Sequence, residues 1–198
     1  MRPGGERKLM RRLLRVLRAF LFCPGVAAVV FRTATPEDSG EVLAWVRRLA
    51  KYERLGALCV STEADLFSAL HPNGVVHAAF ADDLENADAS GDGATMGFVL
   101  WYFGYSTFAG RRKLFVEDLF VHHAHRSKGV GRFLLGTLAK IAAEEDCASV
   151  EWAVLDENIP AQAFYRSLGG SPVRDWSLWS ADPASVMSLA LNAGPWSN

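Results

Sequence analysis

The chain has 198 residues, half of them hydrophobic, and a net charge of −1. This length suits one domain with a sizeable core and is too short for two ordinary domains. The three cysteines are widely spaced and form no Cys-x-x-Cys pair. This argues against a disulfide framework or a zinc site and indicates a reducing compartment, expected to be the cytoplasm. Residues 1–25 hold seven cationic side chains and one acidic one, so the remainder is acidic; such a body does not suit nucleic acid and attracts a cationic small molecule.

Residues 1–25 are predicted to form an extension ahead of the domain. They have the pattern of a basic amphipathic helix with apolar residues on or near one face, namely Leu9, Leu13, Leu14, Leu17, Phe20 and Leu21. The sequence shows no transmembrane span and no cleavage pattern for secretion. Three interpretations stay open: a targeting or membrane-surface helix, an oligomerisation arm, or a dispensable extension upstream of the functional start, which we favour. The domain is predicted to span 26–191, with 192–198 as a C-terminal tail.

The domain opens with a predicted strand over 26–33. Thr35-Pro36-Glu37-Asp38 then combines a capping residue, an N1 proline and first-turn acids, which predict a helix to about Glu53. Later helices are predicted over 61–70, 129–145 and 160–168, with a short one beginning at Asp182-Pro183. Later strands are predicted over 75–81, 96–105, 113–121, 149–155 and 174–180.

Residues 82–95 are acidic and rich in Ala, Gly and Ser, which predicts a surface loop between two strands. The strands 96–105 and 113–121 are almost continuously apolar, which indicates burial on both faces. Strands that first follow one another and then alternate with helices predict an α/β fold, with a mixed sheet covered by helices on both sides.

The turn Arg126-Ser127-Lys128-Gly129-Val130-Gly131 joins the strand 113–121 to the following helix. A helix N-terminus after such a turn leaves backbone N–H groups unpaired and carries partial positive charge, so it can bind phosphate. A dinucleotide fingerprint would need a third glycine where Leu134 stands, and a P-loop would need Gly-Lys-Ser/Thr, so neither is present. The remaining Arg-x-x-Gly-x-Gly pattern resembles the pyrophosphate loop of the GNAT acyltransferases, which bind acetyl-CoA. Two glycines that merely open a core helix remain the alternative.

Glu117 and Asp118 interrupt the apolar strand directly before this turn. Burying a carboxylate without a partner is costly, so two of them in an apolar strand indicate either specific partners or a function. Because adjacent strand residues face opposite sides, we expect one carboxylate to face a cleft as a general base and the other to lie elsewhere. The alternative is that backbone N–H groups or arginines satisfy both carboxylates at a strand bulge.

His122, His123 and His125 lie between the carboxylates and the turn. Neighbouring histidines at a strand end point in different directions, and no cysteine or carboxylate stands at ligand spacing. We therefore expect exposed loop histidines and no bound metal.

Tyr165 is a candidate general acid, since a phenol can reprotonate a leaving thiolate that lies close to it. It belongs to the pattern Asn158-x-x-Ala161-x-x-Phe164-Tyr165-x-x-x-Gly169. That pattern resembles the second half-site of the GNAT family, where the asparagine touches the cofactor and the tyrosine serves the sulfur.

Four further segments narrow the resemblance. They are Arg48-Leu49-Ala50-Lys51-Tyr52-Glu53, Tyr102-Phe103-x-Tyr105-Ser106-Thr107, 116–121 and Ala153-Val154-Leu155-Asp156. Together they resemble the spermidine/spermine N1-acetyltransferase family, most of all its thialysine-acetylating branch, often called diamine acetyltransferases. This resemblance covers residues 26–190. It implies the GNAT fold, with a mixed, mostly antiparallel sheet whose central strands splay apart, and a homodimer with substrate contacts from both subunits.

The resemblance also implies roles for individual residues. Glu117 and Tyr165 would be catalytic, and Tyr52, Glu53, Glu117 and Trp176 would line the amine site. Acetyl-CoA would be held by Leu119, Phe120, Val121, Arg126, Ser127, Lys128, Gly129, Val130, Gly131, Arg132, Asn158, Ile159, Pro160 and Ala161.

Several positions depart from the polyamine-preferring members. Ser106 stands where they have an aspartate, as it does in the thialysine branch, so an anchor for a distal ammonium is missing. Phe108 stands where a tryptophan is usual, and Glu157 replaces another tryptophan. The loop 110–113 is one residue longer. These departures favour a lysine-like amino acid or a short diamine over a long polyamine.

The sequence thus predicts an acetyl-CoA-dependent N-acetyltransferase that acts on a small primary amine by direct transfer in a ternary complex. One alternative is a protein or peptide N-acetyltransferase of the same fold, which would need an open groove for backbone. Another is a non-catalytic acyl-CoA-binding protein, which the presence of Glu117 and Tyr165 argues against.

Overall fold

A computed structural model describes residues 29–84 and 95–193. The predicted N-terminal extension, most of the predicted loop 82–95 and the end of the C-terminal tail lie outside these residues. The chain divides into two compact units, one ending at Leu155 and the other beginning at Asp156. Each unit is described by itself.

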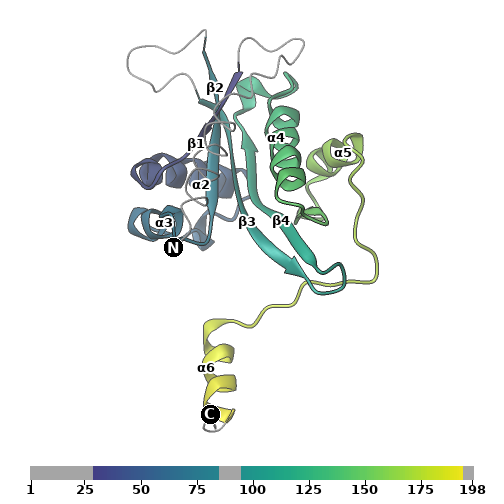
Figure 1. The fold of residues 1–198 in the computed structure, drawn as a ribbon. Helices are drawn as coiled ribbons and strands as arrows, with labels where there is room; N and C mark the ends of the chain where they lie inside the picture. The colour runs from purple at the N-terminus through teal and green to yellow at the C-terminus, as the bar shows by residue number, and fades with distance from the viewer. Residues whose placement is uncertain (1–28, 85–94, 194–198) are drawn as a thin grey trace, which may run out of the picture. The chain divides into compact units, whose positions relative to one another are not determined.

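The first unit is built on a five-stranded sheet whose strand order follows the chain (Figure 1). Its strands are β1 (Val29–Thr33), β2 (His77–Asp83), β3 (Thr95–Ser106), β4 (Arg111–Val121) and β5 (Val150–Trp152). β1 to β4 pair antiparallel in sequence order, and β5 pairs parallel with β4. The predicted mixed, mostly antiparallel sheet is therefore confirmed.

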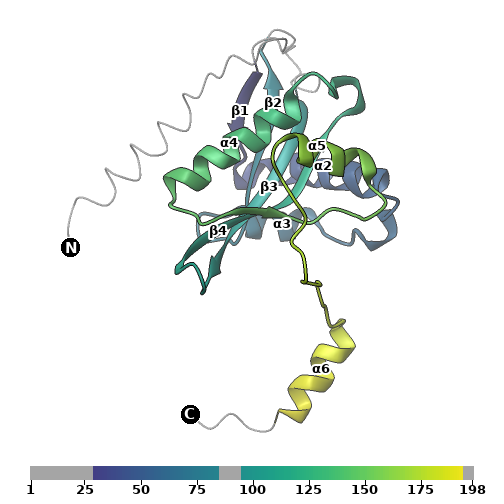
Figure 2. The ribbon, with the colours of Figure 1, turned by 90° about the vertical axis from the view of Figure 1, so that its right-hand side faces the viewer.

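Helices cover both faces of this sheet, as predicted. On one face lie α2 (Ser39–Tyr52) and α3 (Glu63–Leu70), and on the other lies α4 (Val130–Glu144), which runs across the strands (Figures 1 and 2). Short 3₁₀ turns occur at η1 (Pro36–Asp38), η2 (Gly56–Leu58) and η3 (His123–His125). A capping box begins α3, because the Asp65 N–H donates to Thr62 Oγ1 over 3.2 Å and the Thr62 N–H donates to the Asp65 carboxylate over 2.9 Å.

The core lies on both sides of the sheet. On the α2 side, Trp45 is only 2% exposed and packs its ring against Phe98 and Phe120. On the α4 side, Phe31 of β1 contacts the rings of Trp101 and Phe133. Full burial of one large apolar side chain contributes about 1.5–3 kcal/mol, so these ring clusters hold the helices to the sheet.

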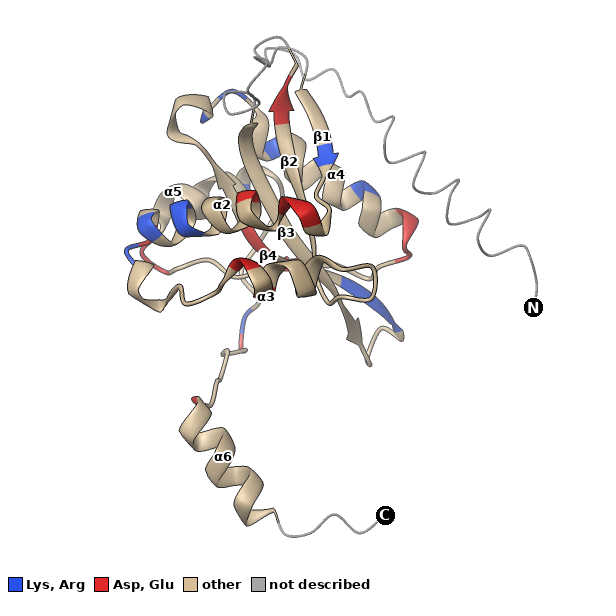
Figure 3. Cartoon of the chain, turned by 90° about the vertical axis from the view of Figure 1, so that its left-hand side faces the viewer, with Lys and Arg blue, Asp and Glu red and all other residues tan. Residues whose placement is uncertain are grey.

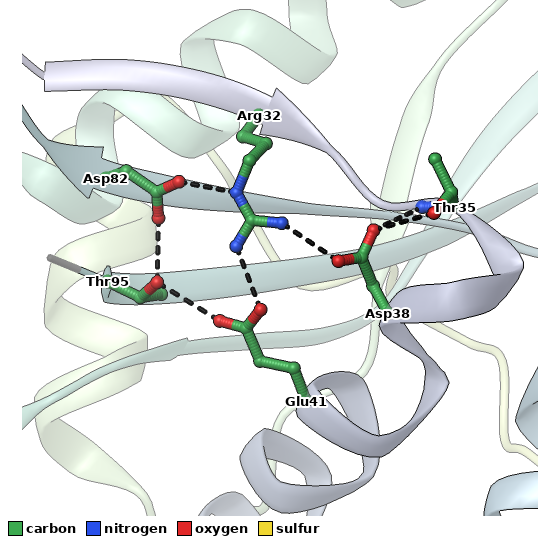
Figure 4. A network of polar contacts seen from close by, with 6 residues as sticks. All are labelled: Arg32, Thr35, Asp38, Glu41, Asp82 and Thr95. Carbon is green, nitrogen blue, oxygen red and sulfur yellow. Dashed lines mark hydrogen bonds and ion pairs between the residues drawn. The ribbon is translucent and has the colours of Figure 1, made fainter. Parts of the chain in front are cut away.

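An arginine on β1 ties four elements together at one end of the sheet (Figure 4). Arg32 donates to Asp82 of β2 over 2.6 Å, to Asp38 of η1 over 3.1 Å and to Glu41 of α2 over 2.9 Å. Thr95 at the start of β3 donates to both Asp82 and Glu41. Burial alone would lower the pKa of Arg32, but its hydrogen bonds to Asp82 and Glu41 outweigh burial and raise this pKa, so the cation persists at any ordinary pH.

This network corrects the prediction that residues 82–95 form a loop. Asp82 and Asp83 continue β2, with Asp82 paired to Val30 and Asp83 to Val29. The acidic composition suggested a solvated loop, but Arg32 supplies the counter-charge that keeps Asp82 in the strand. The predicted strand 149–155 is also shorter in the structure, because β5 pairs with β4 over three residues only.

The second unit contains α5 (Ile159–Ser167) and α6 (Pro183–Asn192). The predicted helix starts are confirmed: Asn158 caps α5 and Asp182 caps α6, each by accepting an N–H three residues on. The predicted strand 174–180 is wrong, because these residues are irregular and pair with no strand among the described residues. A strand must satisfy its backbone groups with a neighbouring strand, and alternation of side chains cannot supply that neighbour.

The close pairing of β3 and β4 makes a testable demand on Gly97. A Cβ added there would lie 2.8 Å from the Phe120 carbonyl oxygen, which is backbone and cannot rotate away. We expect Gly97→Ala to lower the free energy of unfolding by about 1–3 kcal/mol, measured by urea titration. The matched control is Gly136→Ala in α4, where a Cβ would meet nothing within 4 Å. That change should raise stability by about 0.5–1 kcal/mol, and equal effects of the two substitutions would contradict this packing.

Candidate active site

The second half of β4 has an open edge. β4 pairs with β3 along its whole length, whereas β5 pairs with β4 only from Leu114 to Val116. Beyond Val116, no strand among the described residues pairs with that edge. This matches the predicted splaying of the central strands.

The register shows which backbone groups point to this open edge. The His122 N–H donates to the Met96 carbonyl over 2.9 Å, just past the pairing of Val121 with Gly97. That bond makes Val121 and Gly97 a pair without mutual hydrogen bonds, so the N–H and C=O of Val121 point away from β3. Leu119, two residues earlier, has the same orientation. These groups can bind the amides of an extended ligand as a neighbouring strand would.

The turn after β4 leads directly into the N-terminus of a long helix. Ser127 and Gly129 both have positive φ, 60° and 87°, and Gly129 is the N-cap residue of α4. Gly129 has no side chain that could cap the first turn of α4, so the first N–H groups of this 15-residue helix are available to a ligand. Lys128 and Arg132 are exposed beside them. The structure thus brings the predicted residues 127–132 together at a helix N-terminus.

A bulge lies in β4 at the two carboxylates. Leu100 pairs with Asp118 and Trp101 pairs with Val116, so Glu117 is an extra residue without a partner position on β3. Because Asp118 stands opposite Leu100, which belongs to the core on the α2 side, it faces α2. The bulge shifts the alternation of side chains along β4 by one residue, and the expectation that one carboxylate faces a cleft and the other lies elsewhere stays a prediction.

Two further carboxylates act on Asp118 at this bulge. Burial raises the pKa of Asp118 to about 6, and the charges of Glu117 and Glu53 add to the rise. Glu53 is the C-cap residue of α2, and burial raises its own pKa. Asp118 and Glu53 therefore favour a cation or a proton near them. The charges of the predicted amine-site residues Glu53 and Glu117 both reach Asp118, which the sequence did not assign to the amine site.

Tyr52, another predicted amine-site residue, ends α2 beside this cluster. Its ring packs against Phe120 of β4 with centroids 5.8 Å apart. Acidic side chains also fill the first turns of the helices on this face of the sheet, namely Glu37, Asp38, Glu41, Glu63 and Asp65 (Figure 3). Asp38 and Glu41 among them already pair with Arg32, so the attraction of the site for a cation rests on the carboxylates around Asp118.

The remaining predicted site residues belong to the second unit. Asn158 accepts the Ala161 N–H over 3.2 Å through its side-chain oxygen, so this oxygen serves as the cap of α5. Ile159, Pro160 and Ala161 form the first turn of that helix, and Tyr165 lies in its last turn, with its ring against Phe164. Trp176 lies in the irregular segment between α5 and α6 rather than in a strand.

The three histidines cluster in η3. The ring centroid of His122 lies 4.2 Å from that of His123 and 6.0 Å from that of His125. Burial and the positive charges of its neighbours lower the pKa of His122, so this side chain favours the neutral form. Among the residues that the structure describes, no group of three or more His, Cys, Asp or Glu side chains is placed to hold a metal ion.

The sequence offered a strand bulge at the carboxylate pair only as the alternative, and the register shows that the bulge is present. Sequence reasoning missed the direction of the Arg126 side chain, which was predicted to hold the cofactor and here packs over Tyr52 and Phe120. The Arg-x-x-Gly-x-Gly spacing carries no information on that direction.

Comparison with known proteins identifies the class to which this fold and site belong. Residues 61–169 match the Acetyltransferase (GNAT) family. The match spans more than half of the chain, and the open strand edge followed by the anion-binding turn lies inside it. The chain belongs to the GNAT acetyltransferase family, as its motifs predicted.

Individual relatives sharpen this assignment. A thialysine N-epsilon-acetyltransferase from Sus scrofa is 31% identical over 155 residues, which cover 78% of this chain and 91% of that protein. An L-ornithine N5-acetyltransferase from Arabidopsis thaliana is 29% identical over 74% of this chain and 81% of its own length. A solved integron cassette protein from V. cholerae has the same fold, with a TM-score of 0.66 and 22% identity over 82% of this chain and 97% of that one. The predicted resemblance to thialysine acetyltransferases is confirmed.

No helix in the described part of the chain is both long enough and apolar enough to span a membrane.

The carboxylate cluster predicts an unusual pH dependence of stability. Folding raises the pKa of Asp118 from 3.8 to about 6, so the folded state binds more protons between these values and the free energy of unfolding falls as pH rises through them. Asp118→Asn removes the cost of the charge. It should raise the free energy of unfolding by about 1–3 kcal/mol at pH 8 and change it little at pH 4, measured by urea titration.

Asp65→Asn is the matched control because hydrogen bonds from Thr62 lower the pKa of Asp65. A carboxylate whose pKa is lower in the folded state stabilises the protein at any pH above its pKa in the unfolded state. That stabilisation is lost as the pH falls through the pKa of the folded state. Asp65→Asn should therefore be less stable than the wild type at pH 8. If Asp118→Asn is also less stable than the wild type at pH 8, the charge of Asp118 does not destabilise the folded protein, and the prediction is wrong.

Proposed function

We propose that this chain transfers the acetyl group of acetyl-CoA to the terminal amine of a small amino acid, with thialysine, lysine and ornithine as the leading substrate class. The observation that carries the proposal is the bulge in β4. It lies at Glu117 and Asp118, next to a strand edge that is open to an extended ligand, and the charge of Glu53 at the end of α2 also acts on Asp118. A cation and a thioester can meet there.

The strand edge and the turn suit acetyl-CoA as cosubstrate. The backbone groups of Leu119 and Val121 would pair with the amides of its pantetheine arm, and the first turn of α4 would bind its pyrophosphate. The thioester carbonyl develops negative charge as the amine attacks, and the backbone N–H groups of Leu119 and Val121 are the donors proposed to stabilise it.

Proton transfer sets the remaining demands. Deprotonating an amine of pKa near 10.4 at pH 7 costs about 4.6 kcal/mol, so a base must take the proton. Glu117 is the proposed base, acting through water, and Tyr165 is the proposed acid that protonates the leaving sulfur. The amine nitrogen then forms its bond to the acetyl carbon as the carbon–sulfur bond breaks, and free CoA leaves as the thiol.

The substrate class follows from charge and from the relatives. Relatives of this chain are named for thialysine and for ornithine, both amino acids with a terminal amine. Tyr52, Glu53 and Trp176 are the proposed lining of the amine site together with Glu117. Ser106 offers no carboxylate for a distal ammonium, which favours a short substrate. We further propose that the acetyltransferase domain spans residues 26–191 and acts as a homodimer in the cytoplasm.

The role of Tyr165 is tested by removing its hydroxyl. Tyr165→Phe should lower kcat by on the order of 10²-fold, because the sulfur then leaves without a proton donor, while binding of CoA measured by calorimetry stays unchanged. Tyr105→Phe is the control, since Tyr105 is 62% exposed on β3 and has no proposed role. Turnover that is the same in both variants would refute the assignment.

The substrate class is tested with the whole chain and acetyl-CoA, by following thiol release with thialysine, lysine, ornithine, putrescine, spermidine and a lysine-containing peptide. We expect kcat/KM to be highest for the amino acids and at least tenfold lower for spermidine, because Ser106 leaves a distal ammonium without a counter-charge. Activity on the peptide but not on the amino acids would instead identify a protein acetyltransferase. Binding of CoA without turnover of any amine would identify an acyl-CoA-binding protein.

A further inference from the structure

The side chain of Arg126 contacts β4 and the end of α2. Its Nε donates a hydrogen bond to the Val121 carbonyl over 3.0 Å. Its guanidinium carbon lies 4.4 Å from the ring centroid of Tyr52 and 5.3 Å from that of Phe120. One arginine from the turn therefore contacts both the open edge of β4 and the last residue of α2.

These contacts use one N–H donor of the guanidinium and one of its faces. An arginine binds phosphate best as a fork with two parallel N–H donors. Here Nε is engaged by a backbone carbonyl, so a fork that uses Nε is already taken, and the cation lies over two aromatic rings, which attract it electrostatically. The other cations of the turn, Lys128 and Arg132, lie closer in sequence to Gly129, the N-cap residue of α4, and so to the first N–H groups of that helix.

The contacts also join the two halves of the candidate site. The Val121 carbonyl is one of the backbone groups that point to the open edge of β4, where the acyl donor is proposed to bind. Tyr52 precedes Glu53 at the end of α2, where the amine is proposed to bind. Tyr52 and Phe120 are themselves in ring contact, so Arg126 completes a stack that fixes α2 against β4.

We propose that Arg126 is a positioning residue rather than a phosphate ligand: it locks Tyr52 onto the open edge of β4 and so couples amine recognition to the acyl-donor edge. This inference rests on the proposed acetyltransferase function. Arg126 touches neither reacting group, and it acts through Tyr52 and through the Val121 carbonyl.

The test compares two acyl donors, acetyl-CoA and acetyl-pantetheine, because only the first carries phosphates. Arg126→Met should raise the KM for the amine about threefold to tenfold and lower kcat/KM by the same factor with either donor. The reason is that the substitution removes the contacts with Tyr52 and the Val121 carbonyl, which do not involve the phosphates. Lys128→Met is the matched comparison and should lower kcat/KM with acetyl-CoA only. A loss in Arg126→Met that is confined to acetyl-CoA would overturn the proposal.

Arg126→Lys gives a second test should the methionine variant fold poorly. Lysine keeps the charge and remains a good phosphate binder, but it loses the planar group and the Nε bond to Val121. A positioning role predicts a raised KM for the amine with both donors. A phosphate-binding role predicts kinetics close to those of the wild type.

Failure of the Arg126 proposal can be distinguished from failure of the acetyltransferase proposal. If the wild type acetylates no amine, the acetyltransferase proposal fails, and Arg126 is then judged from calorimetric binding of CoA alone. A smaller loss of CoA affinity in Arg126→Met than in Lys128→Met supports positioning. An equal or larger loss contradicts it.

Discussion

The hydrogen-bond pairing of β4 is the constraint on which the rest of this structure depends. On one side β4 is paired along its whole length with β3, while on the other side β5 meets it over three residues only. Backbone groups that point toward the open side must find a ligand, water or a side chain. The Val121 carbonyl accepts a hydrogen bond from Arg126 Nε. Arg126 therefore already satisfies one acceptor at this edge, while the N–H of Val121 and the backbone groups of Leu119 also point to the open side.

The bulge at Glu117 is a second consequence of that pairing. An extra residue lets β4 remain paired with β3 on both sides of the bulge while it turns Asp118 toward α2. This arrangement is costly, since burial and neighbouring charges raise the pKa of Asp118 to about 6. Elsewhere in the unit, buried charge is balanced, as in the cage of carboxylates around Arg32. Unbalanced charge that is concentrated beside an open strand edge is typical of a functional site.

Local signals predicted the helix starts and most of the sheet from the sequence. Thr35 with Pro36, and Asp182 with Pro183, are capping patterns whose physics lies within a few residues, and both appear as predicted. Features that depend on distant partners were not predictable in the same way. The strand expected at 174–180 lacks a neighbour to pair with, Asp82 stays in β2 because of an arginine fifty residues away, and the bulge is visible only in the register of two strands.

The same distinction applies to the site. The anion-binding turn could be predicted because glycines and a helix start make it locally, whereas the direction of the Arg126 side chain depends on where α2 ends. The carboxylates illustrate how such long-range placement becomes chemistry. Burial and the charges of Glu117 and Glu53 make the ionised form of Asp118 costly, so this carboxyl favours a proton or a cation near it. An ammonium substrate would supply the missing counter-charge and lower the pKa of Asp118, so arrival of the amine would favour the ionised cluster that binds it.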